Sequence, residues 1–198
     1  TMIEHVFPNE VVSYNINDKW IYSIFKNASS SLRNSSTKKP IVLQQHKKLK
    51  DIYVFIREPT QRFNSGVSTF LEYTQRDIGI DQSSLLTLIS TYNILNRHYA
   101  PQMFWVLNLF RYVDDSCVIH FNEIEKLFEI LNKKTIPTKT KQHVDIVDQY
   151  YELDQILYSE LVGNSLTKVE TIQYIKNNYW HLFNKCFGTV KELCAVLD

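Results

Sequence analysis

The sequence predicts an α/β fold in which a short parallel sheet is flanked by helices in a single domain, 1–198. The run DIYVFI at 51–56 is the first observation, since its β-branched and aromatic residues are typical of a strand buried in a parallel sheet. The second is a repeated order of strand, loop and helix, because KWIYSIF at 19–25 and DIYVFI are each followed by residues that start helices. The third is size, since 198 residues with 44% hydrophobic content suit one domain with its own core.

Hydrophobic periodicity predicts the other elements. Residues 10–25 alternate apolar and polar side chains around the turn Asn-Ile-Asn-Asp, which indicates a hairpin arm before the strand at 19–25. The Ser-rich segment that follows favours a loop opening a helix, which Pro40 ends, and 41–50 stays ambiguous. SCVIHF at 116–121 predicts another strand. Apolar residues at helical spacing predict helices over 83–112 with a break near Pro101, over 122–134, over 149–161, and along the tail from 165 onward.

Charge and glycine content exclude several classes of protein. The 22 Lys and Arg residues against 21 Asp and Glu leave a net charge of +1, so we expect no broad basic surface and no nucleic-acid partner. Only four glycines are present, and neither G-x-G-x-x-G nor G-x-x-x-x-G-K-[ST] occurs. Dinucleotide-dependent enzymes and ordinary P-loop NTPases are therefore disfavoured.

Cysteine usage and hydropathy favour a reduced, cytoplasmic location. Cys117, Cys186 and Cys194 are odd in number and lack C-x-x-C spacing, which does not suit a disulfide framework. His181, Cys186 and Cys194 are three candidate zinc ligands, which is too few, and their spacing is unsuitable. We therefore expect no metal. No apolar run approaches 18 residues and the chain does not start like a secretory signal, so we expect a soluble protein without a membrane partner.

A first candidate anion site follows the strand at 19–25. A lysine and a run of hydroxyl residues at a strand-to-helix junction gather an ammonium, backbone N–H groups and hydroxyls around one point, which suits a phosphate. This P-loop-like strand, loop and helix would use Lys26, Asn27, Ala28, Ser29, Ser30 and Ser31. The alternative interpretation is a Ser-rich helix cap or a solvated loop.

A second candidate anion site follows the strand at 51–56. Arg57 lies at the carboxyl end of that strand, where open α/β sheets bind their ligands. Arg62 and Ser65 come next on the expected helix, so a guanidinium fork and a hydroxyl could meet a second phosphate. For Arg62 the alternative is an i,i+4 ion pair with Glu58 on an exposed helix face.

These two segments resemble the sulfotransferases that use 3′-phosphoadenosine 5′-phosphosulfate (PAPS), in particular their carbohydrate-type and bacterial members. IYSIFKNASSSL is similar to the 5′-phosphosulfate loop of that family, with Phe25 in place of the usual proline and Ala28 in place of the usual glycine. VFIREPTQRFNSGVS is similar to the 3′-phosphate loop. HYAPQMFWVLNLF, VIHFNEIEKLFEIL and YYELDQILYSEL resemble later family segments more weakly, so the resemblance covers about 18–162 and leaves 163–198 as a helical C-terminal extension.

The resemblance implies sulfuryl transfer from PAPS to a hydroxyl or amine of a carbohydrate or small-molecule acceptor. The product would be 3′-phosphoadenosine 5′-phosphate (PAP), and no metal is needed. Lys26 would stabilise charge on the leaving phosphate. The residues that the resemblance assigns to nucleotide binding are Lys26, Asn27, Ala28, Ser29, Ser30, Ser31, Arg57, Arg62 and Ser65.

Sulfuryl transfer also needs a general base, for which histidine is the natural side chain at neutral pH. His46, between the two loops, is the first candidate and His98 the second, while the resemblance gives Glu58 a scaffolding role. A noncatalytic nucleotide- or anion-binding module of the same fold is the alternative function, which the departures at Phe25 and Ala28 keep open. A small nucleotide kinase is a third reading, which the absent Gly-Lys-[Ser/Thr] disfavours. The sequence leaves the oligomeric state open.

Overall fold

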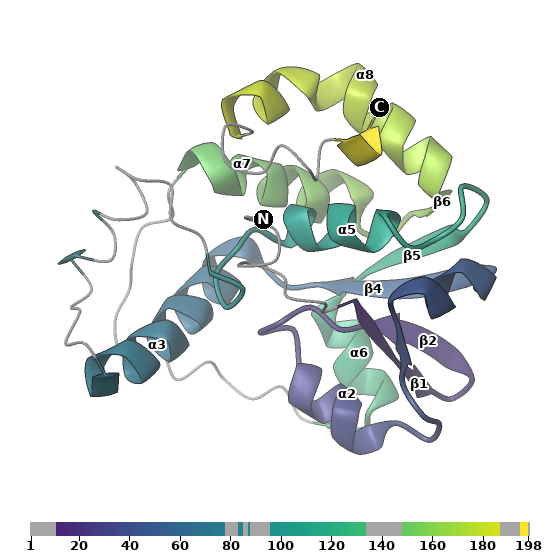
Figure 1. The fold of residues 1–198 in the computed structure, drawn as a ribbon, viewed down its shortest axis with the longest axis horizontal. Helices are drawn as coiled ribbons and strands as arrows, with labels where there is room; N and C mark the ends of the chain where they lie inside the picture. Colours follow the sequence, from purple (N-terminus) through teal and green to yellow (C-terminus); the bar gives the residue numbers. More distant parts are fainter. Residues whose placement is uncertain are drawn as a thin grey trace.

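A computed structural model describes residues 11–77, 83–84, 87, 96–133, 148–186 and 195–197. These residues form a six-stranded sheet with helices on both faces (Figure 1). The strand order across the sheet is β3-β1-β2-β4-β5-β6. The α/β class is thereby confirmed, whereas the single domain stays a prediction.

The centre of the sheet is parallel. It consists of β2 (Lys19–Tyr22), β4 (Asp51–Ile56) and β5 (Val118–Glu123). Ile21 lies opposite Tyr53 in the β2–β4 pair, and Tyr53 lies opposite His120 in the β4–β5 pair. Because parallel strands end at the same edge, the segments after β2 and β4 emerge side by side.

The outer strands are antiparallel, so the sheet is mixed and the expectation of a parallel sheet holds only for its centre. On one side, β1 (Val12–Ile16) pairs with β2, and β3 (Ile41–Val42) pairs with β1. On the other side, β6 (Ser165–Thr167) pairs with β5, inside the tail that periodicity assigned to helix. A three-residue strand is too short to show an alternating pattern in sequence.

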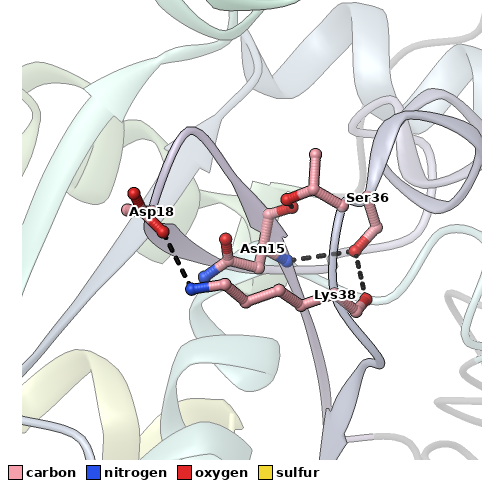
Figure 2. A network of polar contacts seen from close by, with 5 residues as sticks. Asn15, Asp18, Ser36 and Lys38 are labelled. Atoms are coloured by element: carbon pink, nitrogen blue, oxygen red, sulfur yellow. Dashed lines mark hydrogen bonds and ion pairs between the residues drawn. The ribbon is translucent and has the colours of Figure 1, made fainter.

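The β1–β2 hairpin closes with a two-residue turn. Asn17 and Asp18 both have positive φ, 49° and 62°, as the tightest hairpin turns require. Figure 2 shows how the segment after α2 is attached to this hairpin: Lys38 Nζ lies 2.8 Å from Asp18 Oδ1, and the Asn15 N–H donates to Ser36 Oγ at 3.3 Å. The ion pair is exposed, so it fixes position more than it adds stability.

Helices cover the two faces of the sheet differently (Figure 1). On one face lie α2 (Ser29–Ser35) and α6 (Ile124–Ile130). The opposite face carries α5 (Gln102–Phe110), α7 (Asp148–Ile156), its π-helical continuation η2 (Leu157–Leu161), and α8 (Lys168–Cys186). The long α3 (Pro59–Asp77) follows β4. Short 3-10 turns occupy η1 (Leu43–Lys48) and η3 (Ala195–Leu197).

The core is divided by the sheet into two clusters because successive side chains of β4 point to opposite faces. Ile52, Val54 and Ile56 join the larger cluster, which contains α5. Tyr53 and Phe55 face the smaller cluster beneath α2 and α6. All nine residues of α5 are buried, so the helix expected after Pro101 is confirmed as a core element.

Two expectations lie partly outside the described residues. Of the helix expected over 83–95, only 83, 84 and 87 are described, and these are helical. Cys194 lies outside, and of Cys186 only the backbone is described. Among the helices that the structure describes, none combines the length and apolar character that a membrane crossing needs.

Candidate functional site

Both candidate loops leave the sheet at the carboxyl ends of adjacent parallel strands. After β2 the chain makes a turn in which the Asn27 N–H donates to the Ile24 carbonyl at 3.1 Å. Lys26 and Ala28 have φ of 68° and 61°, so both adopt the left-handed conformation. Ala28 is the N-cap of α2 and makes no side-chain cap bond, which rules out a serine cap as the function of this run.

Gln102, the first residue of α5, joins the two loops. Its Oε1 accepts from Asn27 Nδ2 at 2.6 Å and from the Arg57 N–H at 2.9 Å, while its Nε2 donates to the Arg57 carbonyl at 2.9 Å. Asn27 Nδ2 also donates to the Phe55 carbonyl at 2.9 Å. Gln102 therefore holds both loops in a fixed mutual position, a role that its place in the HYAPQ segment did not reveal.

The arginines of the second loop hold the backbone of the first. Arg57 Nη1 donates to the Lys26 carbonyl at 2.9 Å, and Arg62 Nε donates to the Phe25 carbonyl at 3.1 Å. Arg62 Nη1 donates to the Ala100 carbonyl at 2.5 Å. Arg57 is half-buried and stays beside the loops, whereas Arg62 is 1% exposed and lies in the core behind them.

Glu58 has the scaffolding position that the resemblance implies. Its carboxylate oxygens accept the backbone N–H groups of Thr60 at 3.1 Å and of Gln61 at 2.8 Å. These are two of the first donors of α3, which a helix leaves unpaired. The carboxylate caps the helix, while the buried Arg62 does not lie on an exposed face as the i,i+4 interpretation required.

Asp154, on α7, is the buried acid next to Arg62. It accepts the N–H groups of Gln102 at 2.8 Å and Met103 at 2.9 Å, which caps the start of α5. Burial raises its pKa to about 6, while the Arg62 charge and these hydrogen bonds oppose the rise. Burial lowers the pKa of Arg62 to about 10. The two buried groups are coupled by their charges, because Arg62 favours the ionised form of Asp154 and Asp154 favours the charged form of Arg62.

The Lys26 ammonium is the partly buried lysine cation of the candidate site. Its Nζ donates to Thr69 Oγ1 at 2.7 Å, on the face of α3 where Thr69 Oγ1 also donates to the Ser65 carbonyl at 3.1 Å. Burial lowers the pKa of Lys26, and the nearby Arg57 charge lowers it further. An ammonium that is partly desolvated and next to another cation favours a bound anion.

His98 completes this group. Asn96 Oδ1 accepts the backbone N–H of His98 at 3.0 Å and lies 2.7 Å from its Nδ1. An oxygen that accepts both bonds places the imidazole proton on Nδ1 and leaves Nε2 with its lone pair. Burial first, then the charges of Arg97, Lys26 and Arg62, lower the pKa of His98 to about 4, so the ring is neutral at pH 7.

Aromatic rings surround His98. Its ring centroid is 5.8 Å from that of Phe25 and 6.0 Å from that of Tyr73. Phe25 stacks on Trp105 at 5.2 Å and carries the Arg97 guanidinium over its ring at 5.0 Å. Phe25, which replaces the usual proline of the resembled family, therefore packs the loop against α5.

The segment of His98 also approaches α3 closely. A Cβ on Gly66 would lie 2.0 Å from the His98 carbonyl oxygen, so only glycine fits at this point of the helix. This contact explains the glycine in NSGVS and fixes the distance between the imidazole segment and the Lys26 side of α3.

His46 lies apart from this group. It is 0% exposed, with Nε2 2.8 Å from Ser13 Oγ and Nδ1 2.8 Å from the Leu43 carbonyl. Both ring nitrogens thus have protein partners near β1, and burial lowers the pKa of the ring. A catalytic role for His46 stays a prediction, and it would require η1 to open.

The remaining site predictions are distributed around the loop. Ser29 and Ser31 are half-buried and Ser30 is exposed in the first turn of α2, and Ser65 is half-buried on α3. Within the described residues no three His, Cys, Asp or Glu side chains are grouped as a metal site would need. The described Cys117 thiol is buried and free, and burial raises its pKa to about 11.

We predict that Ala28→Gly stabilises the protein by about 0.5–1 kcal/mol. Glycine removes the strain of the left-handed backbone conformation, and this gain exceeds the additional conformational entropy that glycine loses on folding. Urea unfolding measures the change. Ala100→Gly is the matched control at a buried position without positive φ, and it should destabilise. Equal effects of the two substitutions would contradict the strain at Ala28.

We predict that Asp154→Asn destabilises the protein by about 3 kcal/mol, since it leaves the buried Arg62 guanidinium without a counter-charge. The double variant Arg62→Met with Asp154→Leu removes both charges and should lose less stability than Asp154→Asn alone. Denaturant unfolding of the three proteins decides this. A double variant that is the least stable would show that the two charges do not depend on each other.

Comparison of the chain with protein-family models, with curated proteins and with solved structures gives no match. The likeness to PAPS-dependent sulfotransferases therefore rests on the sequence segments alone, mainly on the two loops and more weakly on the three later segments.

Proposed function

We propose that this site binds PAPS and transfers its sulfuryl group to a hydroxyl or amine of a carbohydrate or small-molecule acceptor. One observation carries the proposal: Lys26 and Arg57 lie together where two adjacent parallel strands end, and His98 is near enough for the Lys26 charge to lower its pKa. Gln102 and Arg62 hold the two loops in place. This edge is where open α/β sheets bind ligands.

Lys26 suits the part of a cation that stabilises the departing phosphate. When the sulfur–oxygen bond to the donor breaks, negative charge collects on the phosphate oxygen of PAP. An ammonium that is already held by Thr69 and partly desolvated would meet this charge without reorganisation. No metal ion is needed for that step.

His98 suits the part of the general base better than His46. Its Nε2 carries the lone pair, its Nδ1 is held by Asn96, and its low pKa keeps the ring unprotonated at neutral pH. It would take the proton of the acceptor hydroxyl as the oxygen attacks sulfur. The proton returns to water when the product leaves.

Arg57 and the loop backbone are the groups that would hold the nucleotide phosphates, together with Ser65 and the hydroxyls of Ser29, Ser30 and Ser31. Arg57 is half-buried beside the Lys26 carbonyl, so a phosphate could reach its guanidinium. The buried Arg62 contributes its charge from behind the loops, and in this conformation it supports the site without a direct phosphate contact.

We predict that PAP stabilises the folded protein far more than ADP. At about a hundredfold excess over Kd the gain is about 2.7 kcal/mol, which corresponds to a melting-temperature rise of roughly 5–10 °C for a chain of this size. Lys26→Ala should lose most of this rise, while Lys50→Ala, at an exposed residue outside the site, should keep it. Differential scanning fluorimetry of the unchanged protein and the two variants, each with PAP and with ADP, measures the six combinations.

Transfer of ³⁵S from PAPS to a panel of sugars and small alcohols or amines is then the functional assay. His98→Gln and Lys26→Ala should each reduce transfer by roughly 10²-fold or more. A PAP-specific shift without transfer to any acceptor would support the noncatalytic nucleotide-binding module. Equal shifts with PAP and ADP, or none, would contradict the proposal altogether.

We predict that the His98 imidazole titrates near pH 4 in the free protein and at higher pH when PAP is bound. The bound anion offsets the Lys26 charge, which is one of the charges that lower this pKa, and a nearby negative charge favours the protonated ring. NMR of the histidine ring protons follows the titration, with His98→Gln assigning the signal. A titration midpoint that PAP leaves unchanged would place the nucleotide elsewhere.

A further inference from the structure

We propose that Ser165, His120 and Asp51 form a second site, in which Ser165 is a nucleophile toward small carboxylic esters. The three residues come from β6, β5 and β4 and share one face of the sheet. Asp51 is the first residue of β4, whereas Arg57 follows the last one. The second site therefore lies at the opposite end of β4 from the proposed nucleotide site.

The strand register brings the three side chains together. His120 lies directly opposite Ser165 in the antiparallel β5–β6 pair and directly opposite Tyr53 in the parallel β4–β5 pair. Asp51 precedes Tyr53 by two residues, so its side chain points to the same face as that of His120. No loop rearrangement is needed to align them.

The hydrogen bonds give each atom a definite role. His120 Nε2 lies 3.1 Å from Asp51 Oδ2, and His120 Nδ1 lies 2.7 Å from Ser165 Oγ. An ionised carboxylate only accepts, so the imidazole proton is on Nε2. Nδ1 then accepts from the Ser165 hydroxyl, which is the relation between a serine nucleophile and its base. In the familiar triads Nε2 accepts from the serine and Nδ1 donates to the aspartate, whereas here the two nitrogens exchange these roles. The imidazole can still act as the base toward the serine.

The nucleophile is accessible. Ser165 is exposed on the edge strand of the sheet, and the His120 side chain keeps 23% of its surface exposed. Thr167, two residues along, directs its N–H away from β5 and donates it to Glu170 Oε2 at 2.8 Å. Because Ser165 has the same parity on the strand, its own N–H points outward as well. It would offer one donor to the oxyanion of a tetrahedral intermediate.

Neighbouring groups define the class of substrate. Tyr53 stacks on His120 with ring centroids 4.5 Å apart, and Lys19 Nζ lies 5.5 Å from the centre of the Tyr53 ring. Ser165 and Asp51 are exposed, and Tyr53 and Lys19 are partly exposed beside them, so an aromatic ring and a cation lie next to the nucleophile. These neighbours suit a small ester with an aromatic or anionic part.

The reaction balances as an acyl transfer. Ser165 Oγ attacks the ester carbonyl, its proton moves to His120 Nδ1, and the bond to the alcohol breaks as that proton passes to the leaving oxygen. Water then attacks the acyl-serine with His120 again as base, which releases the carboxylic acid and restores the hydroxyl. Asp51 does not touch the substrate and acts as a positioning residue for the imidazole.

The test is covalent labelling by a fluorophosphonate probe, in which Ser165 Oγ displaces fluoride from phosphorus and the serine proton goes to His120. Mass spectrometry of the labelled peptide should place the adduct on Ser165 and not on Ser159, an exposed helical serine whose hydroxyl donates to the Gln155 carbonyl. His120→Gln should slow labelling by roughly 10²-fold or more. Hydrolysis of p-nitrophenyl acetate by the same proteins should fall in parallel.

Variants separate the chemical role from a purely structural one. Asp51→Ala should slow labelling, and Asp51→Glu, which keeps a carboxylate, should retain more of the rate than Asp51→Ala. Circular dichroism melting checks that each variant is folded. Four outcomes would overturn the proposal. In these, labelling would be absent, equal at Ser159, retained after urea denaturation, or unchanged in a folded His120→Gln protein.

Discussion

The candidate nucleotide site depends on the hydrogen bonds that the buried Arg62 guanidinium donates to backbone carbonyls. A group that stays charged and is 1% exposed must find acceptors inside the protein. It finds them in the Phe25 carbonyl of the first loop and the Ala100 carbonyl before α5, with the Asp154 carboxylate close by on α7. One side chain of α3 thereby connects the exit of β2, the entry of α5 and the helix behind them.

This arrangement divides the cations of the site into two groups. Arg62 and part of the Arg57 fork are used to hold backbone carbonyls, so the loops are preorganised before any ligand arrives. Among the described residues, the Lys26 ammonium and the His98 ring each make one side-chain hydrogen bond, to Thr69 and to Asn96. The remaining ammonium hydrogens of Lys26 and the Nε2 of His98 are the atoms proposed for chemistry. The scaffold is rigid where the backbone turns and adaptable where a reacting group would lie.

The sequence predicted those parts of the molecule in which local pattern and tertiary structure agree. The strand at 51–56 and the helix after Pro101 were predictable because most of the strand and all of the helix are buried. The strand near SCVIHF was predictable because its apolar residues Ile119 and Phe121 alternate with less buried ones. The antiparallel outer strands were not all predictable, because β3 and β6 have two and three residues and owe their form to pairing with a neighbour.

The site was predictable to the extent that its residues are adjacent in the chain. Gln102 and Asp154 act on partners 45 to 75 residues away, and no local pattern in the sequence indicates such contacts. The burial of His46 was not predictable from its neighbours in sequence: lysines follow it, but the 3-10 turn directs the imidazole inward and leaves Lys47 and Lys48 exposed. Sequence position placed it near the loops, whereas its burial separates it from solvent.

The lengths of the outer strands have a consequence for the behaviour of the protein at high concentration. A sheet edge is a template on which a second chain can add a strand and begin to aggregate. In the described part of the sheet the two edges are β3 and β6, whose two and three residues offer few free backbone groups in a row. At β6 one of these groups, the Thr167 N–H, is already bonded to Glu170. The long hydrophobic strands stay in the interior of the sheet, where no other chain can pair with them.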